Sequence, residues 1–274
     1  MELTQENRII HGVWIGKKLS KMECLTIELL QRQGHEFHLW SYDSIANVPH
    51  GVIARDASLI MPRSSIFEYR GKPLNVIPNG GIGSFAHWSD IFQVNLLYKE
   101  GGIYSQMDVA YLKQLNFKQP YVFASLWPYL WPNSIQTFLM KAPKGSLFCK
   151  ECAEELEKLV VPNNMPSLDW FSTLRVITQI AQKHKLIKYS LSRIYINDLG
   201  GQRKGTHFYE DRALRPMVYI IHWSNATHFD EKDNPIPGSL YEYLIEHKSV
   251  DMKYKILSCL RYAVKLLKQL LRIQ

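Results

Sequence analysis

The sequence predicts an α/β protein built on a mainly parallel sheet, because its opening reads strand, helix, strand. A β-branched run spans Arg8–Ile15, an amphipathic stretch spans Lys21–Gly34, and a second apolar run spans Glu36–Tyr42. Parallel strands need such a crossover helix. The chain has 274 residues, 46% of them hydrophobic, which is enough for one large core. We expect one domain over residues 1–248 and a C-terminal extension over residues 249–274.

The first helix has recognisable ends. Ser20 is a residue that favours the N-cap, and Gly34 is a residue that stops helices. The region from Asp43 to Gly83 is rich in Pro, Gly, Ser and Asn, so we expect short elements and loops around a ligand. Gly80, Gly81 and Gly83 lack the Lys-Ser/Thr of a P-loop.

The middle and the end of the chain continue the alternation of helices and strands. A strongly apolar stretch at Ser84–Glu100 predicts a buried helix that ends at Gly101-Gly102. We expect the strand that begins at Ile103 to continue through Val109–Leu112 after an irregular patch. Further strands are expected at Tyr121–Trp127, Thr137–Ala142 and Pro216–His222, and further helices at Cys149–Leu159, Ser172–His184, Ser239–His247 and Lys253–Arg272.

Polar residues interrupt the buried scaffold at two places. Asp90 lies in the middle of the apolar helix, and Gln106 and Asp108 follow the Gly-Gly turn. Buried charges need partners, so we expect a metal, a ligand hydroxyl or a basic side chain beside each carboxylate. In a regular strand, Gln106 and Asp108 would share a face near the strand's carboxyl end, where open α/β sheets bind ligands. A carboxylate there suits Mg²⁺ or Mn²⁺ on a diphosphate; an Asp that only ends a strand is the alternative.

Three motifs resemble a known family. They read I-I-H-x-x-W-I-G at residues 9–16, S-D-I at 89–91, and L-Y-x-x-G-G-I-Y-x-x-x-D-V at 97–109. This pattern resembles the DxD-containing sugar transferases, which include bacterial capsular-polysaccharide and lipopolysaccharide glycosyltransferases and their α-1,6-mannosyltransferase relatives. The large clostridial glucosylating toxins share the central motif. H-W-S-N at 222–225 and P-G-S-L-Y at 237–241 look like the C-terminal part of the bacterial proteins.

The resemblance implies a GT-A fold, a nucleotide-sugar donor and a divalent metal, Mn²⁺ or Mg²⁺. It implies transfer of a hexose or N-acetylhexosamine, from a UDP-sugar and with retention, to a surface polysaccharide or lipid-linked saccharide. Trp14 is placed to stack on the base, and Asp90 to bind sugar hydroxyls. The implied donor-binding residues are Trp14, Asp90, Gln93, Gln106, Asp108 and Asn225, and the implied metal ligands are Asp108 and His222. No catalytic nucleophile or base is assigned.

Two positions depart from the family pattern. Gln106 replaces the first Asp of the DxD, and Gln93 replaces an Arg three residues after the helix Asp. Gln106 contributes no charge, so metal affinity should fall, and Gln93 cannot make the bidentate contact of an Arg. If the family's Asp and Arg face one another, their replacement by Gln106 and Gln93 removes two opposite charges together. Because Asp108, Asp90, the Gly-Gly turn and His222 remain, we expect an active enzyme. The alternative is a catalytically impaired nucleotide-sugar-binding protein that scaffolds a glycan-assembly complex.

The charge of the chain limits its partners. The net charge of +8 suits a phosphorylated ligand, an anionic membrane or nucleic acid. No recognisable nucleic-acid motif accompanies the charge, so we expect no nucleic-acid partner. Lys253–Arg272 is amphipathic and basic, so it can lie on an anionic bilayer or pack on the domain with a solvated basic face.

Four cysteines and a polar N-terminus bear on location. Sparse cysteine usage fits a reducing cytosol, and we interpret Cys149 and Cys152 as structural thiols. Residues 1–8 lack the features of a secretory signal, and no stretch is long and apolar enough to span a membrane. We expect a cytoplasmic protein, with peripheral attachment to the inner face of the cytoplasmic membrane as a further expectation.

Overall fold

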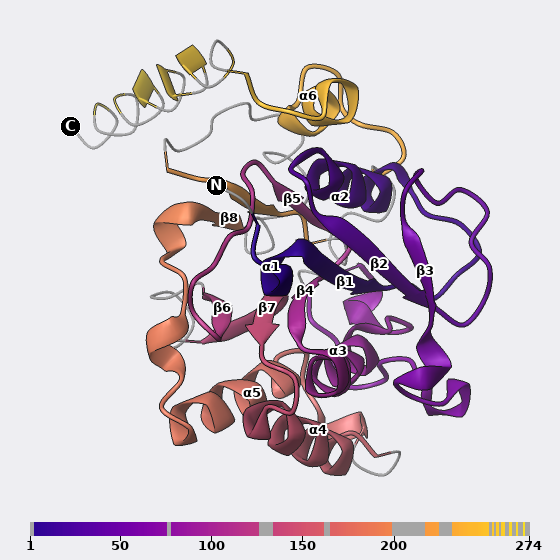
Figure 1. Ribbon diagram of the computed structural model, residues 1–274. Helices are drawn as coiled ribbons and strands as arrows, with labels where there is room; N and C mark the ends of the chain where they lie inside the picture. Colours follow the sequence, from indigo (N-terminus) through magenta and orange to yellow (C-terminus); the bar gives the residue numbers. More distant parts are fainter. Residues whose placement is uncertain are drawn as a thin grey trace.

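The computed structural model describes residues 3–75, 78–125, 134–161, 165–198, 217–224 and 232–251, together with single residues of the C-terminal segment. A six-stranded sheet forms its centre, in the order β3-β2-β1-β4-β7-β6 (Figure 1). The first four strands of that order run parallel, and only β7 runs against its neighbours. The predicted α/β class with a mainly parallel sheet is confirmed. The strands are β1 (Ile9–Val13), β2 (Glu36–Ser41), β3 (Ile53–Asp56), β4 (Gly102–Ser105), β6 (Val122–Ser125) and β7 (Ile135–Ala142).

The order of the strands reverses beside β1. The chain builds β1, β2 and β3 outward in one direction, and it then returns through α3 to place β4 on the other side of β1. Ligands of open α/β sheets bind at such a reversal, outside the carboxyl ends of the two strands. Trp14 follows the end of β1 and Gln106 follows the end of β4, so both lie at this position.

Helices cover both faces of the sheet (Figure 1). One face carries α3 (Ala86–Glu100), α4 (Leu147–Leu159) and α5 (Ser172–Lys183), whose apolar side chains share one core with Trp40 and Tyr104. The other face carries α2 (Lys21–Arg32), which packs on Ile10 and Phe37 in a second core. The helix α3 is buried on most sides, as its apolar composition predicts.

A small second sheet lies beside α2. It pairs β5 (Val109–Tyr111), β9 (Ile220–His222) and β8 (Ile196–Asp198), and a third core joins it to α2 and α6 (Leu240–His247). The prediction of one strand from Ile103 through Leu112 is therefore wrong. The chain leaves the large sheet after β4 and enters the small one at β5, and the irregular patch between them is the crossing.

Local sequence signals explain several element boundaries. Ser20 caps α2 in a capping box, since its hydroxyl accepts from the helix backbone while Glu23 reaches back to the Ser20 N–H. Gly101 turns α3 into β4 with a φ of 71°, and a Cβ there would lie 2.5 Å from the Lys144 nitrogen.

Some elements differ from expectation. A short helix α1 (Gln5–Arg8), β3 and β8 were not predicted, and β9 is shorter than the expected strand at Pro216–His222. The end of the strand expected at Tyr121–Trp127 lies outside the described residues, because the description stops at Ser125. Six 3-10 turns complete the description: Ala57–Leu59, Arg63–Ser65, Pro78–Gly81, Met165–Ser167, Ile187–Tyr189 and Arg193–Tyr195.

The C-terminal segment and the cysteines complete the fold. Only single residues between Tyr254 and Leu271 are described, so the helix expected at Lys253–Arg272 stays a prediction. In the described part of the chain, no helix combines the length and apolarity that a membrane span requires. Cys149 and Cys152 are unbonded and buried in the core beneath α3, and burial raises the pKa of the Cys149 thiol to about 12, as suits an inert structural thiol.

Candidate functional site

The candidate site is built where the chain crosses from the large sheet to the small one. Met107, in this crossing, packs so closely over β1 that a Cβ on Gly12 would lie 2.8 Å from the Met107 sulfur. The same Cβ would lie 2.7 Å from the ring of Phe37. Glycine suits this point of β1, because a Cβ would force the Phe37 ring and the Met107 side chain to shift.

One hydroxyl on α2 fixes the crossing. The Thr26 hydroxyl donates to the Met107 carbonyl at 2.8 Å and accepts from the Val109 N–H at 3.2 Å. Both backbone groups flank Asp108. Because Thr26 is buried in the middle of a helix that packs on two cores, it holds the backbone of Asp108 against a rigid support.

Asp108 faces His222. The Asp108 Oδ2 lies 3.5 Å from the His222 Nε2, and the two side chains are 13% and 15% exposed. The ladder between β5 and β9 sets this pairing, since Val109 is in register with His222. The Asp108 carbonyl accepts from the Trp223 N–H at 2.8 Å, and the His222 ring stacks on Phe138 with centroids 4.3 Å apart. A carboxylate oxygen and an imidazole nitrogen are thus presented side by side and partly open to solvent.

Asp90 lies at the centre of a buried polar network. Its Oδ2 accepts from the Thr173 hydroxyl at 2.5 Å, and the Thr137 hydroxyl also bonds its carboxylate. The Gln106 Nε2 donates to the Thr137 hydroxyl at 3.1 Å, so the network reaches the end of β4. Burial raises the pKa of Asp90 to about 6, against the opposing effect of the two threonine hydrogen bonds.

Gln106 and Asp108 do not share a face. Gln106 bonds Thr137 while Asp108 and its partner His222 lie by Phe138, and consecutive residues of β7 point to opposite faces of the sheet. The prediction that both point one way is wrong, because the strand is not regular after β4 ends at Ser105.

Gln93 lies one turn of α3 after Asp90 and is fully buried. Neither its Oε1 nor its Nε2 has a hydrogen-bond partner among the described residues. The structure therefore gives no support for a face-to-face pair of Gln93 and Gln106, which the paired departures from the family pattern had led us to consider.

Tyr104 ties the parts of the site together. Its hydroxyl oxygen accepts from the Val13 N–H at the end of β1, and the charges of Asp90 and Asp108 both act on it. Burial raises the pKa of Tyr104, and the two carboxylates raise it further. The phenol is therefore neutral, and its oxygen is bonded to the backbone at the end of β1.

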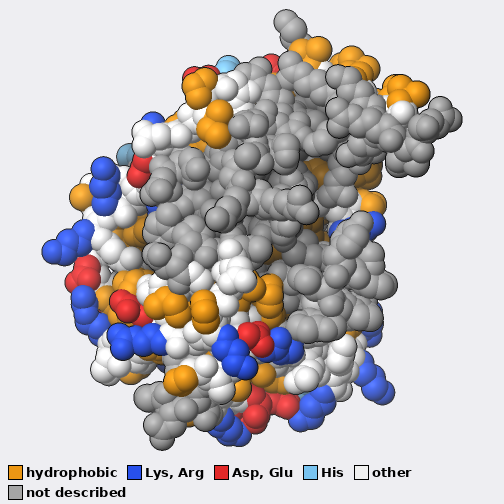
Figure 2. Space-filling model, turned by 180° about the vertical axis from the view of Figure 1, so that it is seen from behind, with side chains coloured by type: hydrophobic (Ala, Val, Ile, Leu, Met, Phe, Trp, Pro, Cys, Tyr) orange, Lys and Arg blue, Asp and Glu red, His pale blue; other side chains and the backbone are white. Residues whose placement is uncertain are grey.

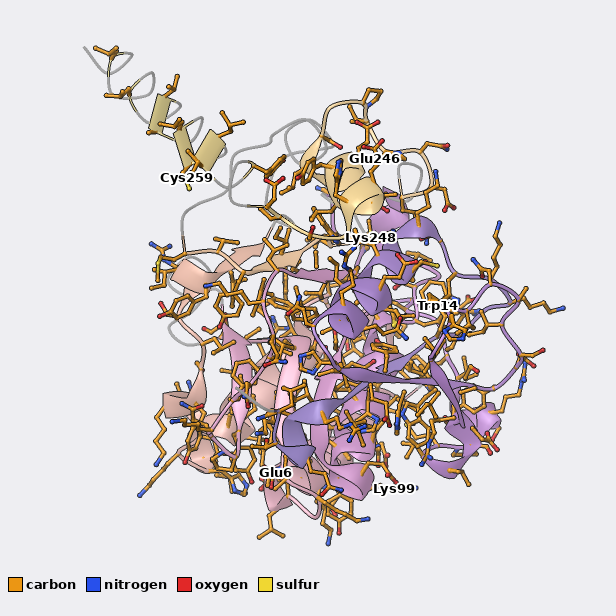
Figure 3. All side chains as sticks on the ribbon, turned by 45° about the horizontal axis from the view of Figure 1, so that its top comes forward. Glu6, Trp14, Lys99, Glu246, Lys248 and Cys259 are labelled. Atoms are coloured by element: carbon orange, nitrogen blue, oxygen red, sulfur yellow. The ribbon has the colours of Figure 1, made fainter. Side chains whose placement is uncertain are left out.

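Trp14 continues the hydrogen bonding of β1. Its backbone N–H donates to the Trp40 carbonyl at 2.9 Å, and its indole N–H donates to the Lys18 carbonyl at 3.0 Å. The Lys232 ammonium lies 5.5 Å from the centroid of the ring. Figure 3 shows Trp14 away from Glu6 and Lys99, which precede β1 and β4 at the opposite end of the strands. Asn225, the last residue implied for donor binding, lies outside the described residues.

Sequence reasoning missed five residues of this arrangement. Thr26, Thr137 and Thr173 stand within apolar helices and strands, where a β-branched residue gives no sign of a polar role. Lys232 lies in a charged loop, where a single lysine gives no sign in the sequence of a special role. Only Tyr104 had a signal, because it belongs to the G-G-I-Y motif.

Residues 40–124 match the family model of the glycosyltransferase sugar-binding region containing the DXD motif. The matched region holds Asp90, Gln106 and Asp108, and it supports a glycosyltransferase function. No curated protein matches the sequence. Among solved structures, the chain is similar to the PaToxG glycosyltransferase, with 18% identity, a TM-score of 0.42, and coverage of 65% of this chain and 68% of that one. It is also similar to apo mouse xyloside xylosyltransferase 1, with 11% identity, a TM-score of 0.44, and coverage of 79% and 98%.

The residues present fit a divalent cation in part. Asp108 and His222 can each give one ligand, and a carboxylate with an imidazole suits Mn²⁺ better than Mg²⁺, which prefers oxygen alone. Across the described ranges, no cluster of three or more His, Cys, Asp or Glu side chains could hold a metal. A cation bound here would need ligands from the substrate or water as well.

Replacing Thr26 by Val should loosen the crossing. The buried Val109 N–H loses its acceptor, so we expect the free energy of unfolding to fall by about 1–3 kcal/mol. Urea unfolding measures this, and Mn²⁺ titration of the folded variant should show weaker binding. Thr26→Ser keeps the hydroxyl and is the matched control. Equal stability and metal binding in the Val and Ser variants would contradict the assigned role.

Replacing Asp90 by Asn should stabilise the protein at neutral pH. The folded pKa of about 6 lies above the unfolded value, so native stability is highest at low pH and falls as pH rises toward that value. Asn removes the buried charge, and we expect a gain of roughly 2–3 kcal/mol at about pH 7.5 that vanishes at about pH 4. Urea unfolding at both pH values measures it.

The control for this change is Asp56→Asn. Asp56 is an exposed carboxylate, and hydrogen bonds from Ser58 lower its pKa, so its replacement should give no gain at neutral pH. An Asp90→Asn protein that is less stable than the parent at neutral pH would show that Asp90 carries no buried negative charge.

Proposed function

We propose that this protein is a GT-A glycosyltransferase that moves a hexose or N-acetylhexosamine from a UDP-sugar to a surface polysaccharide or lipid-linked saccharide, with retention. The observation that carries the proposal is the pairing of Asp108 with His222 at the reversal of strand order, just past the end of β4, with Asp108 inside the matched sugar-binding region. A cation held there lies where open α/β sheets take the phosphates of their ligands.

The residues divide the work of holding the donor. Asp108 and His222 would hold Mn²⁺, and Trp14 offers a flat ring for the base. When bound, the cation would neutralise charge on the departing nucleoside diphosphate. Asp90 offers a carboxylate oxygen to sugar hydroxyls, with Thr137 and Thr173 fixing its orientation. Tyr104 holds the end of β1 in place beside both acids.

The network around Asp90 gives a reason for glutamine at position 106. The Thr137 hydroxyl has one proton, which it gives to Asp90, and its lone pairs are free to accept from the Gln106 amide. An aspartate at position 106 would bring a second acceptor with nothing to donate, and it would repel Asp90. Gln106 therefore fits this site as it stands, which supports an active enzyme over a decayed one.

The loss of folding stability caused by the buried Asp90 carboxylate also supports an active enzyme. A buried carboxylate with a raised pKa destabilises the folded state, and such groups concentrate at functional sites. A protein that only binds nucleotide sugar as a scaffold is the second candidate, and it is favoured by the unpartnered, uncharged Gln93. Turnover distinguishes the two.

The test is a thermal-shift panel of UDP-, GDP- and CMP-sugars with and without Mn²⁺, followed by donor hydrolysis and transfer assays. We expect a shift with a UDP-sugar that depends on Mn²⁺, and turnover. Asp108→Asn and His222→Ala should each lower kcat/KM by about 100-fold or more, since each removes a ligand of the charge-stabilising cation.

Matched controls for these variants are Asp56→Asn and His50→Ala, which change exposed residues outside the site. Both should keep full activity. Binding of the sugar nucleotide with no hydrolysis or transfer would establish the scaffold reading. No binding of any donor would overturn both candidates.

We also propose that the C-terminal segment attaches the enzyme to the inner face of the cytoplasmic membrane, where lipid-linked acceptors are available. Six of its described aliphatic side chains are exposed, and Figure 2 shows orange side chains standing out at the corner that this segment occupies. They are Ile256, Leu257, Leu260, Val264, Leu267 and Leu271, each 44–70% exposed. Lysines and arginines alternate with them in the sequence, which suits an anionic bilayer.

Elsewhere on the view of Figure 2, lysine and arginine side chains are mixed with acidic ones along the rim.

Changing Leu260 and Leu267 to Glu together should abolish binding to vesicles that contain phosphatidylglycerol. The change removes buried apolar area and adds repulsion toward an anionic surface. Co-sedimentation measures it, with phosphatidylcholine vesicles as the uncharged comparison. Leu147→Glu, at a leucine 70% exposed on α4, is the matched control and should leave binding intact. Equal sedimentation of all three proteins would end the membrane proposal.

A further inference from the structure

The Trp14 ring has a cation over it. Trp14 packs against the core beside α2, and its two N–H groups are tied to Trp40 and Lys18. The ring is therefore held in one orientation. The Lys232 ammonium lies over this ring, 5.5 Å from its centroid, within the range of a cation–π contact.

The segment that carries Lys232 is anchored to the start of α2. The Lys232 carbonyl accepts from the Tyr241 hydroxyl at 2.6 Å, and the Asp233 carboxylate accepts from the Lys21 N–H at 3.0 Å. The backbone of this segment is thus fixed. The Lys232 side chain, with four rotatable bonds, is the part that can move.

The ammonium of Lys232 also lies 3.5 Å from Glu23, which is fully buried. Glu23 precedes Thr26 by one turn of α2, and Thr26 clamps the backbone on both sides of Asp108. One turn of helix rises about 5.4 Å. The ammonium therefore lies over the ring of Trp14 and beside the turn of α2 that precedes Thr26.

We propose that Lys232 is a movable cation that recognises the diphosphate of the donor, an inference that rests on the proposed function. Without ligand, its ammonium covers the ring on which the base would stack. A base that binds there displaces the ammonium, which then pairs with the diphosphate beside Asp108. A nucleoside must displace Lys232 without compensation, whereas a nucleoside diphosphate replaces the lost contact by a stronger, charge-assisted one.

The positions of the Trp14 ring and the Lys232 ammonium favour a ligand that carries both a base and phosphate. The aromatic face becomes available only when the cation leaves it. Its departure also breaks the contact with the buried Glu23, so the phosphate must supply the compensating interaction. Lys232 is thus a specificity-determining residue that favours nucleoside diphosphates over nucleosides at a ring that would otherwise stack on either.

The test measures the dissociation constants of uridine and UDP by calorimetry in the presence of Mn²⁺, for the full chain and for Lys232→Gln. We expect uridine to bind about 2–5-fold more tightly in the variant, since a cation–π contact no longer competes. We expect UDP to bind about 10-fold more weakly, since a charge-assisted contact is lost. Guanosine and GDP are measured in parallel.

Two further variants make the result specific. Lys232→Arg keeps the charge and the pairing with Glu23, so it should keep a strong preference for UDP. Lys18→Gln removes an exposed charge next to Trp14 in sequence and should leave the ratio of the two constants unchanged. That ratio does not depend on the fraction of folded protein, so a loss of stability after Glu23 loses its partner does not mimic the effect.

The outcomes separate the two proposals. If the parent protein binds UDP and Lys232→Gln leaves the ratio of the uridine and UDP constants as it was, the role of Lys232 is wrong and the transferase proposal stands. If the parent protein binds neither nucleoside diphosphate, the transferase proposal and this inference fall together.

Discussion

The site depends on one constraint, the crossing of the chain from a six-stranded sheet to a three-stranded one within the three residues between Ser105 and Val109. A chain that leaves a sheet gives up its ladder hydrogen bonds, and buried backbone groups must find other partners. The Thr26 hydroxyl satisfies two of them, one on each side of Asp108. The carboxylate is therefore presented by a backbone that is held from the adjoining helix, and His222 meets it because the second sheet begins at the next residue.

A chain of hydrogen-bond donors and acceptors links the buried Asp90 to Gln106 at the end of β4. The Asp90 carboxylate needs hydrogen-bond donors, and the Thr173 and Thr137 hydroxyls supply them. Once the Thr137 hydroxyl has donated its proton, its oxygen can bond only to another donor. Gln106 supplies that donor. Read alone, the glutamine is a missing ligand of a DxD motif. In the network it is the group that completes the hydrogen bonding of a carboxylate whose pKa is raised to about 6 by burial.

The sequence could predict what local rules decide. The opening strand, helix and strand, the Ser20 cap and the buried α3 follow from composition and periodicity over short stretches. The faces of Gln106 and Asp108 could not be predicted, because Thr26 and the second sheet, both distant in the chain, decide where the strand stops. Thr137 and Thr173 were equally hidden, since a threonine in an apolar strand or helix has the same pattern as a valine until its partner is known.

The helix α2 connects the two charged ends of the site. Its first turn places the buried Glu23 beside Lys232, and its second turn places Thr26 beside Asp108. A metal cation held by Asp108 and the Lys232 ammonium would both bind the same diphosphate. Binding of the diphosphate at one of these positive charges would therefore favour its binding at the other. Such coupling is reciprocal, because two groups that bind one anion must each raise the affinity of the other's site for it.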